Sequence, residues 1–163
     1  MIYEVEGDIL KSGAAAIAHG VAPDDDFHSG LALALREQWP AMYKDFRHFC
    51  HTHSPHIGQA WSWGGAGGTR IVALLTQEPA KDKNDHPGKA KLSAVNHALR
   101  ELRRMVETEG LASIALPRVA TGVGGLDWTE VKPLIEHHLG DLPIPVYLYT
   151  VFHPGVQATE PTV

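Results

Sequence analysis

The chain has 163 residues, 44% hydrophobic and 20% charged, a composition typical of one globular domain with a single core. Its formal net charge is −5 with histidine neutral, and no face rich in Lys or Arg stands out. Broad electrostatic binding to nucleic acid or to an anionic membrane is therefore not expected. The one cysteine, Cys50, leaves no partner for an intrachain disulfide. The N-terminus lacks the pattern of a signal peptide and no apolar run is long enough to span a membrane, so we expect a cytoplasmic protein.

Apolar periodicity predicts an alternation of strands and helices along the chain. The predicted strands are residues 2–6, 14–18, 60–64, 69–76, 112–116 and 144–151. The predicted helices are residues 30–39, 41–51, 89–109 and a segment that ends near residue 139. Pro133 lies inside this last segment, so we expect its first turn to be irregular or the helix to begin late. We also expect loops at 20–29 and 77–88, one domain over 1–152 and a loose polar tail over 153–163.

This alternation is typical of a three-layer α/β/α sandwich with a mixed, largely parallel central sheet. Ligands bind such sheets outside the carboxyl ends of the strands. The loop at 20–29, the loop after residue 76 and the turn at 121–125 all follow predicted strand ends. We therefore expect these three segments to meet at one cleft.

A glycine-rich turn at residues 122–125 connects the strand at 112–116 to a helix start. Asp127 followed by Glu130 forms a capping-box pattern that opens this helix. Glycines at such a turn allow a ligand to approach the backbone, whose N–H groups then form a cradle for phosphate oxygens. Residues 119–126 contain no Lys or Arg, so an anion here is held by neutral dipoles. A tight connection with glycines for packing explains the turn by itself equally well.

Three motifs together resemble the macrodomain family, the module that recognises ADP-ribose. They are Gly7 to Leu10 after the first strand, Ala18-His19-Gly20 leading to Ser29-Gly30-Leu31-Ala32, and Pro117-Arg118 followed by Gly122 to Trp128. The likeness covers nearly all of residues 1–152. The spacing is similar to the branch that contains the terminal-ADP-ribose protein glycohydrolase and the antitoxin that removes ADP-ribose from DNA.

The resemblance implies which residues would bind each part of ADP-ribose. Asp8 and the Ile9 backbone would bind the adenine edge, although capping the turn after the strand explains Asp8 equally well. The loop from 20 to 30 would wrap the distal ribose and one phosphate, and Thr121 to Gly125 would hold the diphosphate. Phe152 or Tyr149 would pack on the adenine, unless each is an ordinary core or edge aromatic. The full set of predicted ADP-ribose-binding residues is Asp8, Ile9, His19, Gly20, Val21, Ser29, Gly30, Leu31, Thr76, Thr121, Gly122, Val123, Gly124, Gly125, Leu126, Tyr149 and Phe152.

The sequence differs from that branch at the positions that carry out catalysis in its hydrolases. Gln77 stands in place of the catalytic lysine, and His28 replaces a glycine of the protein glycohydrolase. Gly124 stands where the protein glycohydrolase has an aspartate, although the antitoxin type also has glycine there. An amide is no nucleophile, so a lysine adduct is excluded at Gln77. Hydrolysis through an oriented water remains open, with Asp26, His28 and Glu78 as candidate catalytic groups; solvated loop charges are the alternative for each.

No metal and no cofactor is predicted. Cys50, His51, His53 and His56 match no standard zinc spacing, and a helix end running into a polar loop explains the cluster. We expect Gly124→Glu to abolish ligand binding with little loss of fold, because it places a bulky anion in the phosphate cradle.

Three alternative functions are consistent with this sequence. The first is binding of ADP-ribose and hydrolysis of ADP-ribosyl linkages on modified protein or nucleic acid. The second is a non-catalytic module that binds ADP-ribose or an NAD metabolite. The third is a protein that interacts with adenine nucleotides or nucleic acid, and the acidic net charge argues against its nucleic-acid version. The expected partner is ADP-ribose or an ADP-ribosylated target, without a membrane and without general nucleic-acid binding.

Overall fold

The structure is a computed structural model that describes residues 1–82 and 85–162. Parts of the predicted loop at 77–88 and of the tail therefore lie outside the described residues. A six-stranded sheet has the order β1-β6-β5-β2-β4-β3. Its strands are β1 (Ile2–Gly7), β2 (Ala16–Val21), β3 (Ala60–Gly64), β4 (Arg70–Leu75), β5 (Ile114–Pro117) and β6 (Val146–Phe152). Only β3 runs antiparallel to its neighbour, so the predicted mixed, largely parallel sheet is confirmed.

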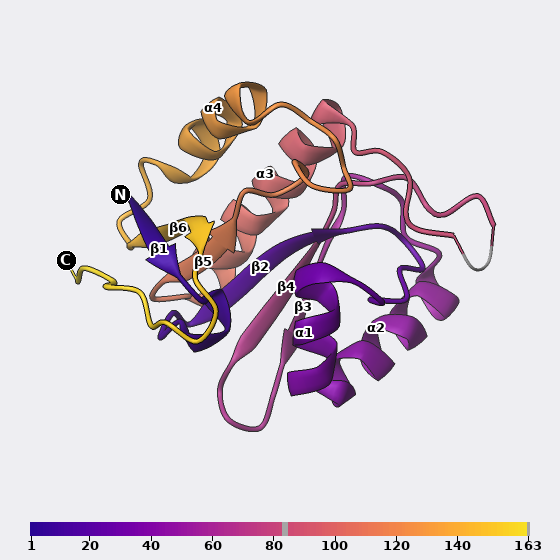
Figure 1. Ribbon diagram of the computed structural model, residues 1–163, viewed down its shortest axis with the longest axis horizontal. Helices are drawn as coiled ribbons and strands as arrows, with labels where there is room; N and C mark the ends of the chain where they lie inside the picture. The colour runs from indigo at the N-terminus through magenta and orange to yellow at the C-terminus, as the bar shows by residue number, and fades with distance from the viewer. Residues whose placement is uncertain (83–84, 163) are drawn as a thin grey trace.

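Four α-helices cover the two faces of the sheet (Figure 1). They are α1 (Gly30–Gln38), α2 (Pro40–His53), α3 (Leu92–Glu109) and α4 (Trp128–Leu139), with a short 3-10 helix, η1, at Ile9–Lys11. The pair α1 and α2 packs on one face, and α3 and α4 pack on the other. The predicted three-layer α/β/α sandwich is therefore confirmed. No helix of the described residues is long and apolar enough to cross a membrane.

Alternate strand residues supply two separate cores. In β4, Val72 and Leu74 face the α3–α4 layer, whereas Ile71 and Leu75 face the α1–α2 layer, and all four are fully buried. A central strand with both faces covered reads as a continuous apolar run for this reason. On α3, the buried side chains Val95, Leu99, Leu102 and Val106 recur at steps of three and four and form one apolar stripe.

Strand β2 is longer at its carboxyl end than predicted. His19, Gly20 and Val21 pair in register with Ala73, Leu74 and Leu75 of β4. The prediction that the loop begins at Gly20 is therefore wrong. Gly20 has little intrinsic preference for a strand, but the pairing with β4 overrides that preference. The extension matters for function because it brings His19 and Gly20 to the edge of the sheet.

Helix α4 begins at Trp128 and continues past Pro133, so the predicted late start or irregular first turn is wrong. Asp127 caps it, because its Oδ1 accepts a hydrogen bond from the Thr129 N–H at 2.9 Å. The cap satisfies one of the N–H groups left free at the helix start. It also fixes the direction in which the glycine-rich turn leaves for the helix.

The C-terminal tail is not loose, contrary to prediction. The Glu160 carboxylate accepts hydrogen bonds from Ser12 Oγ at 2.6 Å, the Gly13 N–H at 2.9 Å and Tyr149 Oη at 2.6 Å. Ala158 packs into the core of the α1–α2 face. Figure 1 shows the tail running back beside β1 and β6, away from α1 and α2. The tail thus covers apolar surface that these helices leave open, which a polar composition does not reveal.

Candidate functional site

Three neighbouring cavities lie along the edge of the sheet where the parallel strands end. The apolar cavity, of about 570 Å³, is lined by Gly7, Asp8, Ile9, Leu10, Gly30, Leu31, Ala34, Pro117, Arg118, Thr121, Gly122, Tyr149, Thr150 and Phe152. The central cavity, of about 280 Å³, is lined by His19, Gly20, Val21, Asp25, Ser29, Gly30, Leu31, Ala32, Gln77, Pro87, Pro117, Arg118, Val119, Ala120, Gly122, Val123 and Gly124. The outer cavity, of about 500 Å³, is lined by Ala22, Pro23, Asp24, Asp25, Asp26, Arg47, Pro79, Ala80, Lys81, Asp82, Asp85 and Pro87.

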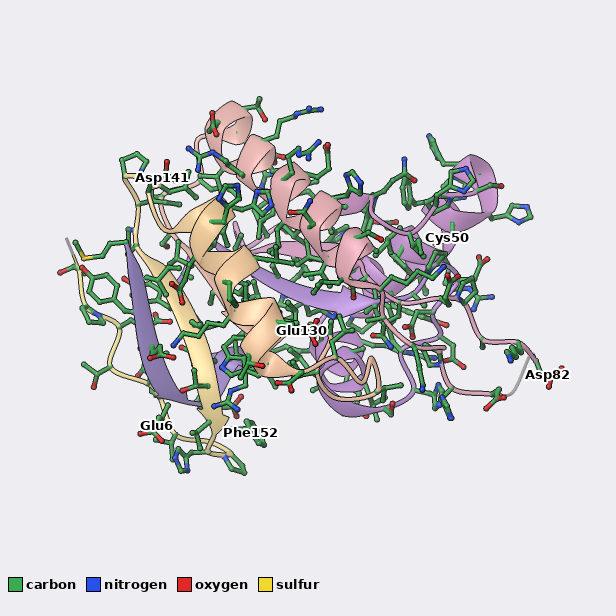
Figure 2. All side chains as sticks on the ribbon, turned by 90° about the horizontal axis from the view of Figure 1, so that it is seen from above. Glu6, Cys50, Asp82, Glu130, Asp141 and Phe152 are labelled. Atoms are coloured by element: carbon green, nitrogen blue, oxygen red, sulfur yellow. The ribbon has the colours of Figure 1, made fainter. Side chains whose placement is uncertain are left out.

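The three cavities form a row because neighbours share walls. The apolar and central cavities share five residues: Gly30, Leu31, Pro117, Arg118 and Gly122. The central and outer cavities share Asp25 and Pro87. In Figure 2, Phe152 and Asp82, from the two outermost cavities, lie on opposite sides of the molecule. The predicted convergence of the loop at 20–29, the start of the loop after residue 76 and the glycine-rich turn is confirmed at the central cavity.

The N-terminus of α1 opens into the central cavity. Ser29 is its N-cap residue but makes no capping hydrogen bond with its side chain. Among the described residues, no acceptor bonds to the N–H groups of Gly30, Leu31 and Ala32. Free N–H groups and the positive end of the helix dipole attract an anion to this point.

The glycine-rich turn supplies a second set of donors to the same cavity. Within the part of the chain that the structure describes, the N–H groups of residues 120–124 bond to no acceptor. The turn is held open by two backbone bonds, from the Gly125 N–H to Gly122 O at 3.0 Å and from the Leu126 N–H to Ala120 O at 3.0 Å. Residues 30–32 and, of the turn, residues 120 and 122–124 line one cavity that is large enough for a diphosphate, so two groups of main-chain donors border the same space.

Two glycines of this turn have different surroundings. A Cβ added to Gly124 would lie 2.5 Å from Ala120 O, so the residue packs against backbone and any side chain here forces the turn to shift. The expectation that Gly124→Glu leaves the fold nearly intact is therefore wrong. A Cβ on Gly122 meets no atom within 4 Å. Gly122 is thus the position from which a side chain can enter the cleft without disturbing the turn.

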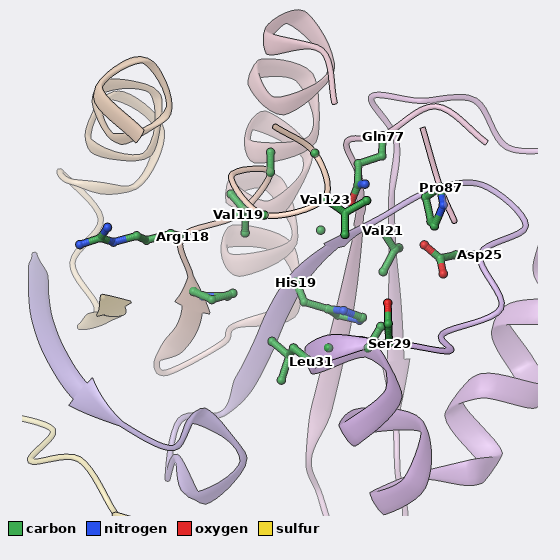
Figure 3. Close-up of a pocket in the computed structure, with 17 residues that line it drawn as sticks. His19, Val21, Asp25, Ser29, Leu31, Gln77, Pro87, Arg118, Val119 and Val123 are labelled. Atoms are coloured by element: carbon green, nitrogen blue, oxygen red, sulfur yellow. The ribbon is translucent and has the colours of Figure 1, made fainter. Parts of the chain in front are cut away.

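The floor of the central cavity carries a buried histidine. His19 is 2% exposed, its ring packs edge-on against Phe27 at 5.5 Å, and burial lowers its pKa to about 4. The imidazole is neutral near pH 7, and its Nε2 has no hydrogen-bond partner among the described residues. Figure 3 shows the ring between Val21 and Leu31 on the cavity side of β2. A hydroxyl of a ligand would satisfy this nitrogen, since an unpaired buried polar atom is costly.

Gly20 and Thr76 lie behind this floor. A Cβ on Gly20 would come within 2.9 Å of Thr76 Oγ1, so a side chain here would force the Thr76 side chain to shift. The Thr76 hydroxyl is fully buried and, like His19 Nε2, unpaired among the described atoms. Thr76 does not line the central cavity, although it was predicted among the binding residues.

The apolar cavity contains the residues that were predicted for adenine. Asp8 caps η1, because Oδ1 accepts from the Leu10 N–H at 3.0 Å, and Oδ2 accepts from the Gly155 N–H at 3.0 Å. Asp8 therefore has the capping role that was the alternative to adenine binding. Its binding of adenine stays a prediction. Phe152, 66% exposed, stands at the wall of this cavity, whereas Tyr149 is buried and bonded to the tail. Phe152 is thus the aromatic side chain that is free to stack on a ligand.

The three predicted catalytic groups do not line the central cavity. Asp26 forms an ion pair with His28 and raises the pKa of that imidazole, and both side chains are well exposed. Glu78 pairs with Lys91 at 2.8 Å. Asp26 borders the outer cavity. Their catalytic roles stay predictions.

Two predicted binding residues, Gly125 and Leu126, support the turn without reaching the cavities. Leu126 packs against the core of the α3–α4 face, and its N–H donates a hydrogen bond to Ala120 O. Their part is to shape the turn from which residues 120–124 present their N–H groups.

Residues that the sequence did not single out also line the cleft. Asp25 is the main one: it is 8% exposed and is the only carboxylate among the residues that line the central cavity. The three consecutive aspartates gave no signal of which one faces inward. The Arg118 guanidinium lies over the Trp128 ring at 5.2 Å, and Figure 3 shows it directed away from the cavity centre. Gln77 lines the cavity while its Nε2 donates to Gly88 O at 3.1 Å.

Comparisons with known proteins point in one direction. A family model described as "Macro domain" matches residues 18–135. The DNA ADP-ribosyl transferase-DNA ADP-ribosyl glycohydrolase fusion protein of Thermosipho africanus is 26% identical over 157 residues, 89% of this chain and 40% of that protein. The ADP-ribose 1''-phosphate phosphatase of Chaetomium globosum is 26% identical over 163 residues and 88% of each chain. Among solved structures, the macrodomain of Thermus aquaticus DarG has a TM-score of 0.79 at 25% identity, covering 91% of this chain and 97% of that one. The chain spans about 40% of the length of the bacterial glycohydrolases it matches.

Proposed function

The chain belongs to the macro domain family, and from this premise we propose that it binds ADP-ribose along the row of cavities and hydrolyses an ADP-ribosyl linkage. Adenine occupies the apolar cavity beside Asp8 and Phe152, and the diphosphate and distal ribose occupy the central cavity. The linked target lies toward the outer cavity. The relatives named as a DNA ADP-ribosyl glycohydrolase fusion protein and as an ADP-ribose 1''-phosphate phosphatase support hydrolysis at the distal ribose.

One observation carries the proposal: two separate groups of residues that line the central cavity, 30–32 and the turn residues 120 and 122–124, have N–H groups that bond to no acceptor among the described residues. Neutral donors of this kind bind a diphosphate without needing a lysine or arginine. The apolar cavity on one side suits a base, and the neutral His19 on the floor suits a sugar hydroxyl. This order of apolar, anion-binding and hydroxyl-binding surfaces matches the order of groups in ADP-ribose.

A second candidate function is binding without turnover. The Gln77 side chain has no nucleophilic group and is already bonded to the carbonyl of Gly88. If no other group in the cleft activates water, the protein is a non-catalytic module that binds ADP-ribose and does not hydrolyse it.

Two measurements separate these functions. Calorimetry with ADP-ribose and with AMP tests the site: we expect ADP-ribose to bind in the micromolar range and AMP much more weakly, because AMP lacks the second phosphate and the distal ribose. The protein is then incubated with DNA-linked, aspartate-linked and glutamate-linked ADP-ribose and with ADP-ribose 1''-phosphate. Release of ADP-ribose from any of them supports hydrolysis, and binding without release supports the non-catalytic binding module. Absence of binding refutes both.

A further inference from the structure

Asp25 stands where the central cavity meets the outer cavity, and it belongs to the walls of both. If adenine occupies the apolar cavity, the distal ribose reaches this boundary, because the three cavities form a row. The bond between the ribose and its target then lies beside Asp25. Figure 3 shows the carboxylate directed into the cavity, on the side of Val21 and Pro87.

The carboxylate is held firmly by its own loop. Oδ2 accepts a hydrogen bond from the Ala22 N–H at 3.0 Å, and Oδ1 accepts one from the Phe27 N–H at 2.9 Å. The neighbours Asp24 and Phe27 take left-handed backbone conformations, with φ of 58° and 53°, which fold the loop around Asp25. An ionised carboxylate has about four acceptor positions, so two remain for a ligand hydroxyl or a water.

We propose that Asp25 is the catalytic general base that activates the attacking water at the anomeric carbon of the distal ribose. This inference rests on the proposed hydrolytic function. In the step, a water O–H bond breaks and its proton passes to Asp25, while the water oxygen bonds to the anomeric carbon. The bond from that carbon to the target breaks, and its electron pair leaves with the target atom, which takes a proton from solvent. Asp25 returns its proton to solvent, so one water is consumed for each ADP-ribose released.

The groups around Asp25 shift the pKa of its carboxyl group, which affects its strength as a base. Burial raises the pKa of Asp25, the two loop N–H groups lower it, the negative charge of Asp26 raises it and His28 lowers it. His19 and Arg118 are the other titratable groups that line the central cavity, and His19 is neutral near pH 7. On the side of the outer cavity, the charged residues in the wall are Asp24, Asp26, Arg47, Lys81, Asp82 and Asp85. A carboxylate with a raised pKa is a stronger base, and proton transfer is most effective when the pKa of the base approaches the working pH.

The test compares Asp25→Asn with Glu37→Gln, which neutralises an exposed carboxylate on α1 that lines none of the three cavities. Single-turnover release of ADP-ribose is measured on the substrate that the wild-type protein cleaves, together with ADP-ribose affinity by calorimetry. We expect Asp25→Asn to lower the rate by about 100-fold or more, with affinity within about threefold, and Glu37→Gln to behave as wild type. A rate for Asp25→Asn within tenfold of wild type overturns the proposal.

A pH profile separates catalysis from a role in loop structure. The wild-type rate is expected to rise with pH as Asp25 loses its proton, and Asp25→Glu keeps this rise at a lower rate because its carboxylate is displaced. Asp25→Asn is expected to lose the rise. If Asp25→Asn instead loses ADP-ribose affinity in proportion to rate, Asp25 only supports the loop and the assignment is wrong. If the wild-type protein binds ADP-ribose but cleaves no substrate, hydrolysis itself is refuted and this inference with it.

Discussion

Gly122→Glu tests the central physical claim, which is that neutral main-chain donors hold the diphosphate. Gly122 lies in the walls of both the apolar and the central cavities, and a Cβ there meets no atom within 4 Å. A glutamate at this position therefore enters the ligand path without disturbing the turn. At a separation of about 5 Å, repulsion between two unit charges is roughly 0.8 kcal/mol in water and roughly 3 kcal/mol at an effective dielectric constant of about 20.

The two phosphate charges double this repulsion, to about 1.5–6 kcal/mol. Affinity for ADP-ribose should fall at least tenfold, since each 1.4 kcal/mol is a factor of about ten. Calorimetry measures the affinity, and thermal unfolding verifies that the variant is folded. Gly122→Gln is the matched control, because it has the same size without the charge. Equal affinities for the glutamate and glutamine variants, or wild-type affinity for both, would show that no diphosphate lies near Gly122.

Three further outcomes are expected. Because burial lowers the pKa of His19 from 6.5 to about 4, the unfolded chain binds more protons than the folded one between these values, so stability should rise with pH across that window by up to about 3 kcal/mol. Urea unfolding between pH 4 and 7 measures this slope, and His19→Gln should reduce it; an unchanged slope contradicts the burial argument. Glu160→Ala removes the acceptor of three hydrogen bonds and should lower the free energy of unfolding by about 1–3 kcal/mol, whereas the exposed neighbour Thr159→Ala should change it little. Gly124→Ala should cost about 1–3 kcal/mol because its Cβ meets backbone, whereas Gly122→Ala should be nearly neutral; equal stabilities in denaturant would refute the packing difference.

Apolar periodicity alone predicted the layers of the fold. The stripe on α3 and the continuous apolar run of β4 are local patterns, because each side chain's direction follows from helix or strand geometry. The glycine-rich turn before α4 was recognisable for the same reason, since positions that require glycine are visible in the residues themselves.

Local pattern did not determine which loop residues meet. Three consecutive aspartates look alike in the sequence, and only the fold of the loop buries Asp25 while Asp24 stays exposed and Asp26 pairs with His28. The ion pair of Glu78 with Lys91 likewise depends on how two separate segments approach each other.

The sequence by itself determined the alternation of strands and helices, the largely parallel sheet and the position of the glycine-rich turn. Only the tertiary structure extended β2 to Val21, by pairing it with β4, and docked Glu160 on Ser12, 148 residues earlier in the chain. It also placed Asp25 at the end of the central cavity. The physical reason is that periodicity reports the direction of each side chain relative to its own element, whereas contacts between distant segments depend on the packing of all the elements together.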